Sequence, residues 1–187
     1  LWGAWERVRA LPDPQGVVRS LRYLDRQGVV LRDQPIHERL RVRWIELDDV
    51  PSYMRDLFVL AEDKRFSAHP GVDPLALARA IFDNARARRV VSGASTLTMQ
   101  VVRLLRPRAR TLSAKMIEAL DALALDRAWT KDRQLETWLN LVPFGHGLRG
   151  LRAASLGYFG KDVGALTPLQ AAHLAITPRR PSRLNPT

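Results

Sequence analysis

From Val50 to the C-terminal end, apolar residues recur at the three- and four-residue spacing of α-helices, interrupted by capping and turn residues. This pattern constrains the fold most, because it predicts a mostly α-helical body. The predicted helices cover about 51–62, 74 onward, 96–106, 111–128, 130–141, 148–159 and 168 onward, the last opening with a capping box at 167–170. In the helix that begins at Pro74, we expect Leu75, Ala78 and Phe82 to point inward.

The segment before this body has a different pattern. Residues 19–24 and 29–32 flank a turn at 25–28 and predict a hairpin, and 39–47 alternates enough for a third strand. We therefore expect an N-terminal juxtamembrane segment with a small β element over 1–48, and the main domain over 49–187.

The composition limits the classes of function. The chain has 187 residues, 46% hydrophobic and 26% charged, which is enough for a domain with a core. Its net charge of +11 favours a polyanionic partner: nucleic acid, an anionic bilayer or a phosphorylated substrate. The absence of cysteine excludes disulfides and thiolate sites. No apolar run reaches the roughly 20 residues of a membrane span.

Two tryptophans lie close to the start of the sequence, ahead of an arginine-containing segment. Trp2 and Trp5 suit the interfacial end of a preceding membrane anchor, although ordinary packing is an equal alternative.

Two glutamates are the candidate catalytic groups. Glu62 follows the apolar run 57–61 at a predicted helix end and precedes Asp63, and Glu118 lies on another predicted helix. Sugar transfer uses one group to deprotonate the attacking hydroxyl and another to assist the leaving group. The alternatives are a solvated helix end for Glu62 and a surface ion pair between Glu118 and Lys115.

A hydroxyl-containing turn and a cationic stretch indicate an anionic substrate. Ser95 or Thr96 opens a helix, where free N–H groups bind phosphate, although a plain helix cap explains either residue equally well. No acidic residue lies between Asp83 and Glu118, whereas eight basic ones do: Arg86, Arg88, Arg89, Arg103, Arg106, Arg108, Arg110 and Lys115. Arg103, Arg110 and Lys115 could flank a diphosphate, although a basic run is more often a solvated face.

Two further polar residues lie near these motifs. His69 is expected to hold a turn, with proton transfer as the alternative, and no histidine spacing predicts zinc. Asn140 either braces the site or caps its helix, and bracing is the preferred interpretation.

Five motifs in order resemble the peptidoglycan glycosyltransferases, glycosyltransferase family 51, the transglycosylase module of class A penicillin-binding proteins. They lie at 62–71, 93–100, 115–118, 135–140 and 158–175. The sequences at 95–100 and 140–145 look most like the penicillin-binding protein 1C branch.

The resemblance implies a lysozyme-like helical fold with a small membrane-facing jaw at about 72–94. It also implies polymerisation of lipid II into β-1,4-linked glycan with release of undecaprenyl diphosphate, by inversion. Glu62 would be the base, supported by Asp63, and Glu118 would act on the donor side. The donor-site positions implied by the resemblance, with Asn140 beside them, are Ser95, Thr96, Gln100, Arg103, Arg110 and Lys115.

The same resemblance implies an enzyme at the periplasmic or other extracytoplasmic face of the inner membrane, with its anchor outside this chain. It implies lipid II, lipid-linked glycan and the membrane surface as partners, alongside other cell-wall synthesis proteins. No cofactor is required by the motifs, although many relatives are helped by Mg or Mn.

Four departures from the family pattern stand out. Ala114 replaces a usual Arg, which removes a phosphate contact unless Arg108 or Arg110 supplies it. Arg103 replaces a usual Lys, Gln170 replaces a usual Glu, and 177–181 departs from the usual sequence of the last motif.

Two other functions remain open from the residues. A glycan-cleaving muramidase or lytic transglycosylase has a similar fold, but cleavage of an uncharged glycosidic bond needs no cationic diphosphate site. A nucleic-acid-binding module fits the net charge, but the chain lacks a stacking platform or recognition motif. We therefore expect no nucleic acid partner.

Overall fold

The computed structural model describes residues 2–17, 21–27, 30–34, 41–89, 93–179 and 186. Its helices are α1 (Trp2–Arg9), α2 (Pro14–Val17), α3 (Ser52–Glu62), α4 (Pro74–Ala87), α5 (Leu97–Leu105), α6 (Leu112–Ala128), α7 (Lys131–Leu141), α8 (Leu151–Phe159) and α9 (Pro168–Ile176). Short 3₁₀ turns are η2 (Leu47–Asp49), η3 (Phe66–Ala68), η4 (Val163–Ala165) and η5 (Thr177–Arg179). The strands are β1 (Leu21–Leu24), β2 (Val30–Gln34), β3 (Arg41–Val42), β4 (Pro143–Gly145) and β5 (Leu148–Arg149).

These elements confirm the mostly helical fold class and fit a lysozyme-like helical domain. The chain forms two compact units, which are described separately. Unit 1 comprises residues 1–11 and 63–134, and unit 2 comprises residues 12–62 and 135–187. The predicted division into 1–48 and 49–187, with a jaw at 72–94, stays a prediction, and residues 90–92 of that jaw lie outside the described residues.

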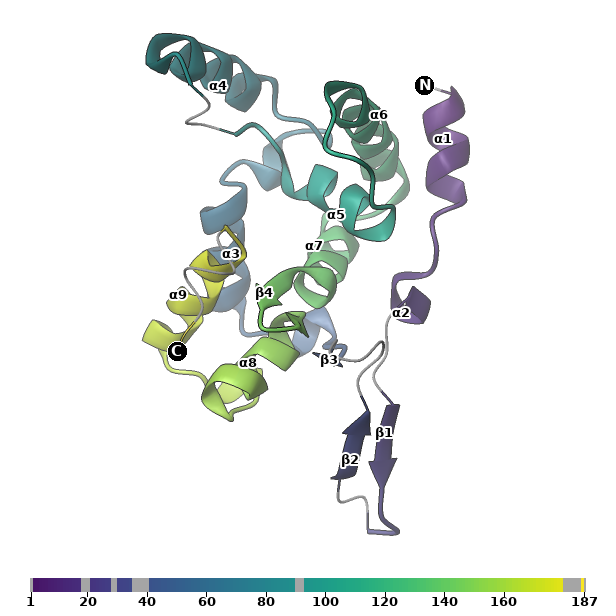
Figure 1. Ribbon diagram of the computed structural model, residues 1–187, viewed down its shortest axis with the longest axis vertical. Coiled ribbons are helices and arrows are strands. Elements are labelled where there is room, and N and C mark those ends of the chain that lie inside the picture. The colour runs from purple at the N-terminus through teal and green to yellow at the C-terminus, as the bar shows by residue number, and fades with distance from the viewer. Residues whose placement is uncertain are drawn as a thin grey trace. The chain divides into compact units, whose positions relative to one another are not determined.

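Unit 1 is built around α6. Helices α5 and α1 both pack against α6, and Figure 1 shows α1 alongside it. The buried carboxylate of Asp121 on α6 accepts hydrogen bonds from Arg7 of α1 at 2.8 Å and from Arg108 at 2.7 Å. Arg106 adds a hydrogen bond to the carbonyl oxygen of Ala10. These contacts hold the N-terminal helix of the chain on α6.

Unit 2 has an aromatic core. Phe58 of α3 makes edge-to-face contacts with Trp138 of α7 and Phe144 of β4, at centroid distances of 5.9 and 6.3 Å, and all three side chains are fully buried. Helix α9 packs against α3. Such aromatic pairs add about 0.5–1.5 kcal/mol each beyond area burial.

The predicted hairpin is confirmed where the structure describes it, since β1 and β2 pair antiparallel. The parts predicted at 19–20 and 28–29 lie outside the described residues. The predicted third strand is wrong in extent: only Arg41–Val42 is a strand, which pairs in parallel with β5 instead of joining the hairpin. Residues 39 and 40 of that prediction also lie outside the described residues.

Two boundaries in unit 2 differ from the predictions. The helix expected over 148–159 begins at Leu151, because Leu148–Arg149 forms β5 and pairs with β4. The turn expected at 143–145 is the strand β4, and the chain reverses after it, at His146 and Gly147, both with positive φ. A three-residue strand is too short for a periodic pattern to identify.

The predicted inward face of α4 is wrong. Leu75 and Phe82 are 57% and 65% exposed, Ala78 is exposed, and Ala80 is the residue of this helix that is buried. The prediction of a helix that begins at Pro74 is confirmed, but its apolar side faces away from the core of unit 1. Spacing along a helix cannot indicate whether its apolar side meets protein or another apolar medium.

The predicted cap at Ser95 or Thr96 is confirmed for Thr96, which accepts from the N–H of Met99, and the predicted capping box of Thr167 and Gln170 in α9 is confirmed. Thr111 also caps α6, which the sequence analysis did not predict. None of the helices in the described part of the chain combines the length and the apolar character needed to span a bilayer.

Asp73 caps α4, with its carboxylate accepting from the N–H groups of Leu75 and Ala76. Burial alone would raise the pKa of Asp73, but the Ala76 N–H, the Arg65 guanidinium and the Leu75 N–H together hold that pKa below 3.8. The ionised cap therefore stabilises the fold at pH values above about 4, and its contribution is lost as the pH falls further.

We expect Asp73→Ala to lower the free energy of unfolding by about 1 kcal/mol at neutral pH, because the cap is lost. Asp73→Asn is the matched control, since it caps without a charge. Urea unfolding at pH 7 and pH 3 should show a smaller loss of stability on acidification in Asp73→Asn than in the unsubstituted chain. Equal losses in the two proteins would contradict this role.

Candidate active site

Glu62 and Glu118, the two predicted catalytic groups, belong to different units. Glu62 is the last residue of α3 in unit 2, and Glu118 lies midway along α6 in unit 1. Asp63 follows Glu62 directly and begins the main segment of unit 1. The prediction that the two glutamates act on one reaction stays a prediction.

Glu62 contacts a cation that the motifs did not single out. Its side chain is largely buried, and Oε1 lies 3.6 Å from Nε of Arg179, at the end of η5. The signal for this contact was the unusual 177–181 sequence, of which residues 180 and 181 lie outside the described residues.

Asp63 organises the first two motifs of unit 1. Its carboxylate accepts from Nε2 of His69 at 3.0 Å and from the backbone N–H of Leu97, the first residue of α5, at 2.9 Å. His69 is buried, as expected for a residue that holds a turn, and its Nδ1 has no hydrogen-bond partner among the described residues. Asp63 therefore holds the start of the 63–134 segment to the first turn of α5 within unit 1.

Thr96 completes this link. Its hydroxyl donates to the carbonyl oxygen of Gly71 at 2.6 Å and accepts from the N–H of Met99. Gly71 has φ of +88°, and a Cβ there would lie 2.3 Å from the carbonyl oxygen of Ala122 on α6, so glycine is required. The Thr96 hydroxyl is thus occupied within the fold, while Ser95 beside it is half-buried.

Glu118 is buried, with 5% exposure, on the face of α6 that also carries Asp121. Its ion pair is with Arg103 of α5, at 3.9 Å, rather than the surface pair with Lys115 that spacing allowed. Gln100, half-buried, lies one turn before Arg103 on the same helix. The structure therefore brings together Glu118 and one predicted diphosphate ligand.

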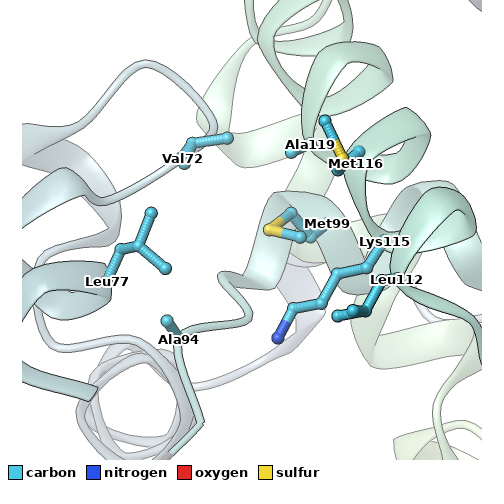
Figure 2. Close-up of a pocket in the computed structure, with 8 residues that line it drawn as sticks. All are labelled: Val72, Leu77, Ala94, Met99, Leu112, Lys115, Met116 and Ala119. Atoms are coloured by element: carbon cyan, nitrogen blue, oxygen red, sulfur yellow. The ribbon is translucent and has the colours of Figure 1, made fainter. Parts of the chain in front are cut away.

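Lys115 and Arg110 are exposed at the start of α6. Lys115 extends beside an apolar hollow of about 290 Å³, which sequence reasoning missed because its lining comes from three separate stretches of the chain, 72–77, 94–99 and 112–119 (Figure 2). Of the two proposed substitutes for the Arg absent at Ala114, Arg108 is bound to Asp121. Arg110 remains the candidate for that phosphate contact.

Asn140 braces unit 2. It is fully buried, its Oδ1 accepts from the N–H of Ile45, and its Nδ2 donates to the carbonyl oxygens of Ile45 and Glu136. Glu136 accepts from the N–H of Leu47 in the same segment. These bonds fit the preferred bracing interpretation better than direct contact with a substrate.

The described residues do not form a metal site. No group of three or more His, Asp or Glu side chains in the described ranges could hold an ion. Glu118 pairs with a cation, and Asp121 is bound by two arginines. This donor set does not fit Mg or Mn, which prefer several oxygen ligands.

The sequence matches the family described as Transglycosylase over residues 27–187. The chain belongs to the transglycosylase family. Relatives of this transglycosylase chain include penicillin-binding protein 1A of Aquifex aeolicus, 40% identical over 144 residues, which cover 76% of this chain and 20% of that protein. Penicillin-binding protein 1C of Escherichia coli is 42% identical over 142 residues, 76% of this chain and 18% of that protein.

Penicillin-binding protein 1F of Bacillus subtilis is 37% identical over 143 residues, which cover 76% of this chain and 20% of that protein. The transglycosylase chain thus spans about a fifth of the length of the curated relatives it matches. The comparisons support the glycosyltransferase domain of class A penicillin-binding proteins without distinguishing the 1C branch from the 1A and 1F types.

We expect Asn140→Ala to destabilise the transglycosylase chain by about 1–3 kcal/mol, because it leaves the buried backbone groups of Ile45 unpaired. The exposed Leu169→Ala in the same unit is the control and should change stability by less than about 0.5 kcal/mol. Urea unfolding measures both. An unchanged Asn140→Ala midpoint would show that the braced segment finds other partners.

Proposed function

We propose that this chain is the glycan-polymerising domain of a peptidoglycan glycosyltransferase. Its substrates are lipid II and a lipid-linked glycan strand. The observation that carries the proposal is the ion pair between the buried Glu118 and Arg103 in a chain of the transglycosylase family. Lys115 lies in the first turn of the helix that carries Glu118, and Arg110 lies just before that helix. This arrangement suits a departing diphosphate, because cations lie beside an acid that water does not reach.

In the proposed reaction, Glu62 takes the proton of the acceptor 4-hydroxyl, whose oxygen attacks the anomeric carbon of the donor. The bond from that carbon to the diphosphate oxygen breaks, and its electron pair leaves with undecaprenyl diphosphate. Attack from the opposite face inverts the centre and forms a β-1,4 bond. The guanidinium of Arg179, 3.6 Å from the Glu62 carboxylate, is the charged neighbour of the proposed base.

The remaining residues assist this step. Arg103, Arg110 and Lys115 stabilise the negative charge that develops on the diphosphate. Ser95 precedes α5, and Gln100 lies one turn before Arg103 on that helix. Both are proposed as donor-sugar contacts. Asp63, Thr96 and Asn140 position the others, since their polar atoms are bound within the protein.

We place this reaction at the extracytoplasmic surface of the inner membrane. Exposed apolar side chains of α4 and α6 support a membrane-facing surface in unit 1: Leu75, Leu77, Ile81, Phe82, Leu112 and Met116. Arginines flank them on α4, at Arg79 and Arg86. Apolar side chains bordered by cations favour an anionic lipid surface. Other cell-wall synthesis proteins remain proposed partners, and the 1C branch remains the proposed subtype.

A glycan-cleaving muramidase or lytic transglycosylase is not favoured, because the matched relatives are penicillin-binding proteins and the cations around Glu118 have no role in cleaving an uncharged bond. Fluorescent lipid II separates the two activities. Polymer that muramidase digests to disaccharide units supports polymerisation. If the chain forms no polymer and cleaves preformed glycan, the proposed polymerase function is overturned.

We expect Glu62→Gln and Glu118→Gln each to lower the polymerisation rate by about 100-fold or more, because each removes an ionisable group at the reacting atoms. The matched controls are the exposed Glu46→Gln in unit 2 and Asp132→Asn in unit 1, which should polymerise lipid II normally. Thermal unfolding checks that the variants are folded. Normal turnover by a folded Glu62→Gln variant would rule out Glu62 as the base. Normal turnover by a folded Glu118→Gln variant would assign the donor-side role to another residue.

We also propose that no divalent cation is required, because Glu62, Glu118 and Asp121 each lie within ion-pair distance of an arginine. EDTA should leave the rate of lipid II polymerisation unchanged. A rate that falls with EDTA and recovers on addition of Mg would contradict this.

A further inference from the structure

We propose that Asp121 is a positioning residue for the diphosphate-binding cations of unit 1. It fixes the segment between α5 and α6, and this segment presents Arg110 to the anion. The proposal rests on the proposed function, in which Arg110 stabilises the leaving diphosphate. It gives a role to the most deeply buried acidic residue of α6, which the proposed reaction does not otherwise use.

Asp121 binds arginines from two other segments of unit 1. Its side chain is almost fully buried, Oδ1 accepts from Nε of Arg7 at 2.8 Å, and Oδ2 accepts from Nη2 of Arg108 at 2.7 Å. Loss of a buried charge leaves its partners uncompensated, so such a group is costly to replace. Asp121 is therefore a fixed point to which both arginine-bearing segments are attached.

The segment that Arg108 attaches to α6 also carries Arg110. We call residues 106–111 the linking segment, because they join α5 to α6 without helix or strand. At its end, Thr111 caps α6 with its hydroxyl, and the N–H of Thr111 donates to the carbonyl oxygen of Ala109 at 2.9 Å. Arg110 is thus the central residue of a tight turn, between the attached Arg108 and the helix cap.

The Arg108 contact sets the direction of the linking segment. Asp121 lies about three turns beyond the Thr111 cap, which is about 15 Å along the axis of α6. For Arg108 to reach this carboxylate, the linking segment has to run back alongside α6 before it turns at Arg110. The ion pair therefore determines how the turn leads into the helix, and with it where the exposed Arg110 lies.

Asp121 also acts on the other end of the linking segment, through α1. Its second partner, Arg7, lies on α1, and α1 packs against α6 (Figure 1). Just after α1, the carbonyl oxygen of Ala10 accepts from Nη2 of Arg106, the first residue of the linking segment, at 3.3 Å. One carboxylate thus supports both attachments of the linking segment, directly at Arg108 and through α1 at Arg106.

The opposite role for Asp121 would be to keep Arg108 away from the substrate. Nη1 of Arg108 is buried and has no hydrogen-bond partner in the described part of the chain. Because this donor is not offered to solvent, positioning fits the structure better than withholding. The two roles predict opposite changes in anion affinity, so an experiment separates them.

Binding of inorganic pyrophosphate to the whole chain at low salt tests the proposal without turnover. We expect Asp121→Asn to weaken pyrophosphate binding about tenfold, because the charge-assisted hydrogen bonds of Arg110 are misplaced. Removal of a negative charge alone would tighten the binding of an anion. Weaker binding is therefore opposite to the simple electrostatic effect, and tighter binding would overturn the proposal in favour of withholding.

Asp126→Asn is the matched control. It removes the same charge from the same helix, together with an ion pair to Lys131, but this pair does not touch the linking segment. Its pyrophosphate affinity should equal that of the unsubstituted chain or exceed it slightly. A loss as large as that of Asp121→Asn would show that any ion pair of α6 has this effect, and would overturn the proposal.

A double-mutant cycle tests whether Asp121 acts through Arg110. Arg110→Gln should weaken pyrophosphate binding by itself, and adding Asp121→Asn should weaken it no further. Losses that add would overturn the proposal. If thermal unfolding shows that Asp121→Asn is not folded, Arg108→Gln takes its place in the cycle, because it releases the linking segment and leaves Arg7 on Asp121.

A conservative variant separates charge from shape. Asp121→Glu restores the carboxylate with one additional methylene, whereas Asp121→Asn keeps the shape and loses the charge. Among folded variants, Asp121→Glu should therefore bind pyrophosphate more tightly than Asp121→Asn. The reverse order would mean that packing at this position matters and the ion pairs do not, which overturns the positioning role.

Lipid II polymerisation, measured in parallel, distinguishes this proposal from the proposed function. Polymerisation by the unsubstituted chain, with equal pyrophosphate affinities for Asp121→Asn and Asp126→Asn, would overturn the positioning role alone. The expected order of pyrophosphate affinities without any polymerisation would support Asp121 as the positioning residue of an anion site and overturn the proposed function alone.

Discussion

The carboxylate of Asp63 is the contact on which the arrangement of unit 1 depends. It binds His69 Nε2 and the N–H of Leu97, so the start of the 63–134 segment is held to the first turn of α5. A carboxylate at a helix N-terminus is favoured by both hydrogen bonding and the helix dipole.

Helix α6 then separates the polar and apolar parts of the unit. Its buried side carries Glu118 and Asp121, each paired with arginine, and Ala122, against which Gly71 packs. Its exposed side carries Leu112 and Met116. Lys115 lies where the two sides meet, with its amine beside an apolar hollow. An amphiphilic diphosphate needs both environments within a few residues, and a single helix supplies them.

Much of the fold could be predicted from local signals. Threonine caps, the proline that follows α5 and the Thr167 capping box set the helix ends, because these interactions involve residues three or four apart. The strands of unit 2 could not be predicted in the same way. Arg41–Val42 pairs with Leu148–Arg149 across more than a hundred residues, and such short segments carry no periodic signal.

The candidate site, like the fold, has a part that could be predicted from the sequence and a part that could not. The available ionisable residues, and the family that their spacing indicates, can be read from the sequence because motifs are local and ordered. Which of these residues are held by other protein groups depends on the packing of the chain. Packing occupied Thr96, Asn140 and Arg108 in internal hydrogen bonds, paired Glu118 with Arg103, and turned the apolar side of α4 outward. These outcomes depend on contacts between segments distant in sequence, whose side-chain partners no local pattern specifies.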